Sequence, residues 1–206
     1  MDEAAILHFP TQQALRACGL YKFWAISGMR AQVELLTWLV NRWNMQDQCF
    51  FIGGHQLKIE LEDIYFLTSL SKRAEQVFLF GTRPGGQSVA NLQLEFCNDQ
   101  ANPRDKQIDI KHIIRPKLKV IAFTVTKLCW SDALHVATGS QIRIAVDCFR
   151  GTIFNWCEAV LANVKGQLTR EKYGKLKNFG YGSIIVSFAL ERIPMLAPQS
   201  IAVDAG

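Results

Sequence analysis

The segment GTRPGGQS, residues 81–88, has the glycine spacing that is typical of a phosphate-binding loop. In such a loop the backbone N–H groups surround the phosphates, and a lysine after the second glycine reaches the β- and γ-phosphates. Here Gln87 occupies the lysine position, and Pro84 removes one backbone N–H from the loop. Two interpretations follow: a degenerate nucleotide-binding enzyme that uses residues 81–88, or a surface turn, which we favour.

The four histidines and six cysteines are the candidate metal ligands and nucleophiles. No two of them stand at a zinc-ligand spacing such as CxxC or HxxxH. Asp132 and His135 share a helix face if this segment is helical, but one pair does not make a site. We therefore assign no catalytic residue, no metal and no cofactor. The cysteine spacing and apolar surroundings are typical of reduced thiols in an intracellular protein.

Acidic residues gather at Glu60, Glu62 and Asp63, just before an apolar run. A transposase would use such a cluster to bind metal ions. The first turn of a helix also favours negative charge, because the helix dipole is positive there. The second interpretation explains the cluster without a further acidic partner, and we adopt it.

Two basic stretches could contact nucleic acid. One comprises Lys111, Arg115, Lys117 and Lys119; the other comprises Lys165, Arg170, Lys172, Tyr173, Lys175 and Lys177, followed by Phe179. Cations interleaved with aromatic rings are suited to binding phosphates and stacking bases, so the second stretch forms a candidate nucleic-acid-binding site. The alternative is a solvated loop between two helices, which the mild net charge of +5 favours.

The elements that would position these residues are mainly helical. Apolar residues at three- and four-residue spacing predict helices over 31–44, over 61–70 and from Asn155 to Leu168. Short helices are expected within 11–29 and over 183–193. A Gly-Gly pair at 53–54 between two apolar runs predicts a small β-hairpin near residues 49–59.

The middle of the chain is less well determined. Residues 77–80 indicate a strand, and 88–96 fits either a helix or a strand. Pro116 suits the first turn of a helix that continues through Ala137 and stops at Gly139, although β-branched residues leave a strand over 120–126 as the alternative. Residues 141–149 alternate only in part. We expect one domain over residues 1–206, with an internal loop boundary at the polar segment 98–107.

Two ordered blocks of apolar and aromatic residues resemble the plant mobile domain family. The first block consists of Leu39, Val40, Arg42, Trp43, Phe51, Leu61, Asp63, Ile64, Leu67 and Leu70; the second consists of Phe154, Asn155, Trp156, Ala159, Val160, Leu161, Ala162, Gln167 and Leu168. The residues at matched positions that we take as structural are Trp43, Phe51, Leu61, Asp63, Leu67, Asn155 and Trp156. We expect Trp43 and Trp156 to lie in the core, and Trp38 is the alternative lining of a partner groove.

The resemblance implies a transposon-derived, non-enzymatic protein-interaction module. It further implies a nuclear protein linked to gene silencing, genome maintenance or meristem maintenance, with a phosphatase-like protein as partner. Some members of that family are labelled aminotransferase-like. We do not extend that activity to this chain, because no lysine has the context of a Schiff-base residue with an acidic partner and a phosphate site.

Composition agrees with a folded intracellular domain. Hydrophobic residues make up 49% of the 206 residues and charged residues 20%, which is enough apolar surface for a core. The longest apolar-rich stretch, over 120–130, is too short and too polar to span a bilayer, and the acidic N-terminus does not fit a signal peptide. The sequence therefore predicts a protein interaction without a membrane, with nucleic-acid binding as the alternative.

Overall fold

The computed structural model describes residues 9–26, 32–77, 88–98, 107–128, 136–174, 181–193 and 196. Its helices are α1 (Phe9–Ala17), α2 (Tyr21–Ile26), α3 (Val33–Asn41), α4 (Leu61–Thr68), α5 (Val89–Phe96), α6 (Pro116–Leu128), α7 (Gly139–Phe149), α8 (Trp156–Lys172) and α9 (Gly182–Arg192), with a 3-10 turn, η2 (Ile110–His112). Its strands are β1 (Trp43–Asn44), β2 (Cys49–Ile52), β3 (His55–Leu57), β4 (Gln107–Asp109) and β5 (Val136–Thr138). The predicted mainly α fold with a small hairpin is confirmed.

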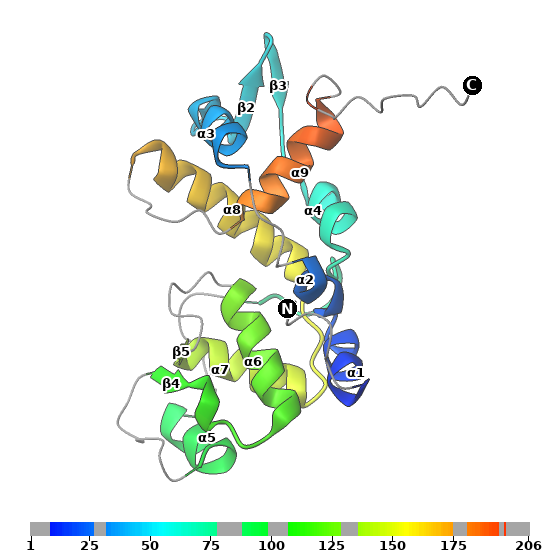
Figure 1. The fold of residues 1–206 in the computed structure, drawn as a ribbon, viewed down its shortest axis with the longest axis vertical. Helices are drawn as coiled ribbons and strands as arrows, with labels where there is room; N and C mark the ends of the chain where they lie inside the picture. The colour runs from blue at the N-terminus through cyan, green and yellow to red at the C-terminus, as the bar shows by residue number, and fades with distance from the viewer. Residues whose placement is uncertain are drawn as a thin grey trace, which may run out of the picture.

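The helices form two groups, which Figure 1 shows one above the other. Helices α3, α4, α8 and α9 pack together with the β1–β2–β3 sheet, and α5, α6 and α7 pack together with the β4–β5 ladder. The chain leaves the first group after α4 and returns to it at α8. Where it leaves and returns, Glu75 and Phe154 form a parallel bridge. Helix α1 packs on α6, and α2 connects α1 to α4.

The predicted hairpin is present, and it carries one more strand than we expected. β2 and β3 pair in antiparallel register across Gly53 and Gly54, whose positive φ angles of 57° and 81° suit glycine. Trp43, predicted on a helix, instead pairs with Phe50 in β1–β2. The helix ends at Asn41 because the chain turns there to place the Trp43 ring against Phe50, with ring centroids 5.0 Å apart.

Helix α4 begins as the acidic cluster predicts. The backbone N–H of Glu60 donates to the Asp63 carboxylate over 2.8 Å, and Asp63 and Glu60 form a reciprocal capping box. The Asp63 side chain is only 7% exposed and also binds the guanidinium of Arg192 in α9. This carboxylate therefore fixes the start of α4 and its contact with α9.

The middle of the chain corrects one prediction. The helix that starts at Pro116 ends at Leu128, and Gly139 is the first residue of α7 instead of a helix stop. The reason is the capping box of Thr138 and Gln141, whose reciprocal bonds start a new helix there. The alternative strand over 120–126 is wrong: its threonines bond back to carbonyls one turn earlier, as Thr124 does to Val120 over 2.9 Å, and the helix is retained.

Three ambiguous segments are resolved in part. Residues 89–96 form a helix because Ser88 accepts a hydrogen bond from the backbone N–H of Asn91. The partly alternating run 141–149 lies in α7. Val77 is buried outside any strand, while 78–80 and most of the 98–107 loop lie outside the described residues.

The core is continuous across both groups of helices. Asn155 caps α8, as predicted, by accepting from the backbone N–H of Glu158 over 3.2 Å. Trp156 follows it, fully buried, and its Nε1–H donates to the carbonyl of Cys18 over 2.8 Å.

Among the described residues, no helix has the length and apolar character that crossing a membrane requires.

Candidate interaction surfaces

The predicted nucleic-acid stretch lies mostly on a helix and not on a loop. Lys165, Arg170 and Lys172 belong to the last turns of α8, and Tyr173 follows as its exposed C-cap residue. Lys175 and Lys177 lie outside the described residues. The helix continues beyond Leu168 because no residue before Gly174, at φ 65°, adopts the left-handed conformation that commonly ends a helix.

Two of these cations have structural partners. The ammonium of Lys172 donates to the carbonyl of Asn41 over 2.5 Å, at the carboxyl end of α3. A cation there interacts favourably with the negative end of the helix dipole. Arg170 donates from Nε to the carbonyl of Gly166 over 3.2 Å, within its own helix. Lys172 therefore holds α8 against α3, and Arg170 keeps much of its guanidinium available to a ligand.

A further cation, Arg42, follows directly after Asn41, the residue that Lys172 contacts. The Arg42 guanidinium lies 3.7 Å from the centre of the Trp38 ring and donates to the Trp38 carbonyl over 3.2 Å. Next to it, residues 41–46 and the exposed Phe51 line a hollow of about 460 Å³. We call Trp38, Arg42, Lys165, Arg170 and Tyr173 the α3–α8 surface.

The residues at the matched family positions have mixed surroundings. Trp43 and Trp156 are buried, and the Trp43 Nε1–H donates to Thr169 Oγ1 over 3.2 Å. Asp63 is buried and Asn155 caps α8, as described above. Leu61 and Leu67 are half-buried, and Phe51 is exposed.

A hollow between α4 and α9 was not anticipated from the sequence. It measures about 410 Å³ and is lined by Glu62, Asp63, Phe66, Leu67, Phe188, Glu191 and Arg192. Phe66 lies at the edge of this hollow with 71% of its side chain exposed, and the buried Phe188 forms part of the lining of the hollow. We call it the Phe66 hollow. The adjacent aromatic residues Tyr65 and Phe66 fall off the apolar stripe of the 61–70 helix, and this signal could have revealed the surface.

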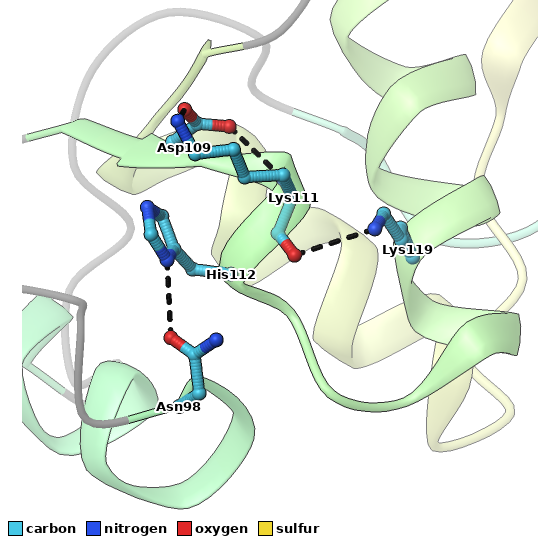
Figure 2. Close-up of polar contacts among 5 residues, drawn as sticks. All are labelled: Asn98, Asp109, Lys111, His112 and Lys119. Carbon is cyan, nitrogen blue, oxygen red and sulfur yellow. Dashed lines mark hydrogen bonds and ion pairs between the residues drawn. The ribbon is translucent and has the colours of Figure 1, made fainter.

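Two lysines of the other basic stretch, Lys111 and Lys119, have partners within the same segment. Figure 2 shows the Lys111 ammonium beside Asp109, 2.7 Å from its carboxylate, and Lys119 donating to the Lys111 carbonyl over 3.3 Å. The hydrogen bond from Lys111 holds the pKa of Asp109 below its usual range. In the same view His112 Nδ1 lies 3.0 Å from Asn98 Oδ1. These contacts join β4, η2 and the start of α6, which favours a structural role.

The candidate chemistry is largely accounted for by packing or lies outside the described part of the chain. The structure does not describe residues 81–87 or the pair Asp132 and His135. Across the described ranges, no three metal-ligating side chains gather at one place. Burial raises the pKa of Cys49, Cys97 and Cys157, the last to about 11, which disfavours a thiolate nucleophile at these positions.

The chain is thus a mainly helical protein with two surface candidates for binding. A family profile matches residues 7–186, so the chain belongs to the family described as Domain of unknown function (DUF8566). No curated protein and no solved structure gave a match.

The resemblance to the plant mobile domain is wrong, because the family that matches is DUF8566 and no plant mobile domain is detected. The two blocks of apolar and Trp residues are what amphipathic helices around any small core require, so their order did not indicate ancestry. The nuclear location, the meristem and silencing roles and the phosphatase-like partner rested on that resemblance, and we do not extend them to this chain.

Proposed function

We propose that this protein is a non-enzymatic protein-interaction module and that the Phe66 hollow is its binding surface. The observation that supports this most is the exposed Phe66 ring beside a hollow whose lining includes the core residue Phe188. Phe66 is 71% exposed and borders a hollow, and apolar surface that continues into a hollow marks an interaction site more strongly than a single exposed apolar side chain does. Aromatic residues of this kind are enriched at the centres of protein interfaces.

The charges around the hollow select the partner. Glu62 and Glu191 line it with exposed carboxylates, whereas the cation on its wall, Arg192, is already bound by Asp63. Lys72 binds Glu62 from outside the hollow over 3.2 Å. In a protein with a net charge of +5, this is a locally acidic site. It suits a peptide segment with an apolar or aromatic anchor flanked by Lys or Arg.

The buried carboxylate of the hollow, Asp63, is used for structure. Asp63 caps α4 and binds Arg192, so its carboxylate is engaged on both sides. A general acid or base must be within hydrogen-bond reach of a substrate proton and free to exchange it. This engagement supports binding over catalysis at the site.

The experiment is a selection of short peptides from a random display library against the full chain. We expect the selected peptides to carry an apolar anchor next to Lys or Arg, and to bind Phe66→Ser at least tenfold more weakly in fluorescence anisotropy. Leu94→Ser is the matched control, because Leu94 is 74% exposed on α5, in the other group of helices. Equal affinity for wild type and Phe66→Ser would refute the proposal, as would a library that yields no binder.

A second candidate function is binding of single-stranded nucleic acid at the α3–α8 surface. The observation in its favour is that Lys172 joins the end of α8, which carries Arg170 and the exposed Tyr173, to the end of α3. Arg42, which follows α3, stacks on Trp38. Cations and exposed rings together bind phosphates and stack bases. Glu158, which lines a hollow together with Lys165, weakens the local positive field, so we rank this candidate second.

A salt titration separates the two functions. If nucleic acid binds, the affinity for a mixed single-stranded pool falls steeply with salt, with a slope that drops by about 0.7 in Arg170→Glu. Arg170 is preferred to Lys172 for this test, because replacing Lys172 would also disturb the end of α3. Lys117→Glu, on the exposed start of α6, is the control. Absence of binding at low salt would exclude this candidate.

A further inference from the structure

The carboxyl end of α8 carries the kind of side chains that the Phe66 hollow suits. Tyr173, the C-cap residue of α8, is 60% exposed. Arg170 and Lys172, in the last turn of the helix, are exposed beside it in the sequence. We call residues 165–173 the α8 end. An aromatic side chain flanked by cations is the partner chemistry proposed above for the hollow, so the chain itself contains a matching ligand.

The hollow and the α8 end have opposite charges. The hollow is lined by three acidic residues and one basic residue, Glu62, Asp63, Glu191 and Arg192. The α8 end carries three basic residues and one acidic residue, Lys165, Arg170, Lys172 and Glu171. Lys72 offsets part of the negative charge by binding Glu62, but the exposed Glu191 keeps the rim of the hollow acidic. Opposite potentials of this kind favour association and fix the orientation of the two surfaces.

The two surfaces cannot meet within one chain. The Lys172 ammonium donates to the Asn41 carbonyl and so holds the α8 end against the end of α3, whereas the hollow lies between α4 and α9. Figure 1 shows the last turn of α8 at the left of the first group of helices and α4 at its right. Tyr173 can therefore reach only the hollow of a second copy.

We propose that the chain associates with itself head to tail, with the α8 end of one copy bound in the Phe66 hollow of the next. This inference rests on the proposed function, because the same hollow is the binding surface. Tyr173 supplies the aromatic anchor that covers Phe66, and Arg170 supplies a cation for the acidic rim. Since the two surfaces differ, each added copy presents a new hollow or a new α8 end, and association continues past the dimer unless a ring closes.

The experiment is sedimentation equilibrium of the full chain at low salt over a series of concentrations. The series extends to about 1 mM, because small and partly polar interfaces are weak. We expect the average mass to rise from the monomer mass of 23.3 kDa to more than twice that value. Added salt should lower the average mass at a given concentration, because it screens the charges of the rim and of the α8 end.

Single variants test each surface. Phe66→Ser and Tyr173→Ser should each weaken self-association by at least about tenfold, because each removes an aromatic anchor of the interface. Both side chains are mostly exposed, so neither change should unfold the protein. Leu94→Ser is the matched control, since Leu94 is 74% exposed on α5 and belongs to neither surface.

An equimolar mixture of two variants tests the head-to-tail arrangement. Phe66→Ser retains the α8 end, and Tyr173→Ser retains the hollow. The mixture should therefore form dimers and nothing larger, although each variant alone stays monomeric. Association of Tyr173→Ser by itself with the affinity of wild type would overturn the proposal, as would a wild-type chain that is monomeric at every concentration.

Failure of this inference can be told apart from failure of the proposed function. A monomeric wild-type chain that still binds the selected basic peptides through Phe66 would overturn self-association and leave the hollow as a binding surface. Peptides that bind wild type and Phe66→Ser equally well, together with a monomeric chain, would overturn both.

Discussion

Trp156 connects the start of α8 to the N-terminal helices, and its removal should be among the most damaging changes in the chain. The side chain is 0% exposed, its ring lies 5.4 Å from that of Phe154, and its Nε1–H is bound to the Cys18 carbonyl. Truncating a buried Trp to Ala costs about 3–5 kcal/mol. Leaving the carbonyl without its donor adds about 1–3 kcal/mol, so the total is about 4–8 kcal/mol.

Trp156→Phe separates the two contributions. Phe retains much of the ring and loses the N–H, so this variant should cost about 1–3 kcal/mol, mainly for the unpaired carbonyl and the smaller ring. The comparison is needed because a loss of about 4–8 kcal/mol is a large part of the stability of a typical domain, about 5–15 kcal/mol, so little folded Trp156→Ala is expected.

The assay is urea unfolding followed by circular dichroism, with stability taken from the midpoint and the slope. Trp38→Ala is the control, since this ring is half-buried, is covered by Arg42 and should cost less than Trp156→Ala. The reasoning would be refuted if the free energies of unfolding of both Trp156 variants lay within about 1 kcal/mol of wild type, because removing a fully buried ring should destabilise the protein by more than that.

Three further predictions concern stability. In a double-mutant cycle of Asp63→Ala and Arg192→Ala, urea unfolding should give a coupling of about 1.5–3 kcal/mol, because a nearly buried carboxylate receives both guanidinium bonds; a coupling near zero would contradict this. Thr138→Ala should lower stability by about 1 kcal/mol through loss of the α7 cap, and an unchanged urea midpoint would speak against it. Burial raises the pKa of the Cys157 thiol from 9.0 to about 11. The contribution of this thiol to the free energy of unfolding is therefore fully present below pH 9 and is lost as the pH rises through 11. The fall in the urea midpoint over this pH range should be smaller in Cys157→Ala.

Local signals in the sequence predicted much of the fold. The Gly53–Gly54 turn, the Asn155 cap and the acidic start of α4 each act within a few residues, so their effect can be read without knowledge of distant contacts. The errors came where tertiary contacts decide. Trp43 leaves the predicted helix over 31–44 to pair with Phe50, and Val33, an apolar residue of the same predicted helix, is exposed because α3 begins there.

The binding surfaces were harder to predict for the same reason. The stretch after Lys165 was visible as a charge pattern, but its contact with Asn41 joins residues that are 131 positions apart. The Phe66 hollow depends on α9 lying beside α4. Periodicity reports which side of one helix is apolar, but it does not report which helix covers that side.

The chain leaves the first group of helices near Glu75 and rejoins it near Phe154, and this order affects folding during synthesis on the ribosome. Helices α3 and α4 are made early, but their packing partners α8 and α9 follow only after the whole α5–α7 segment. Until then the Phe50 ring, which lies 6.1 Å from that of Phe188 in the finished fold, has no aromatic neighbour from α9. The nascent chain must therefore carry exposed apolar surface through much of its translation, and an early-stopped product would be a natural client of chaperones.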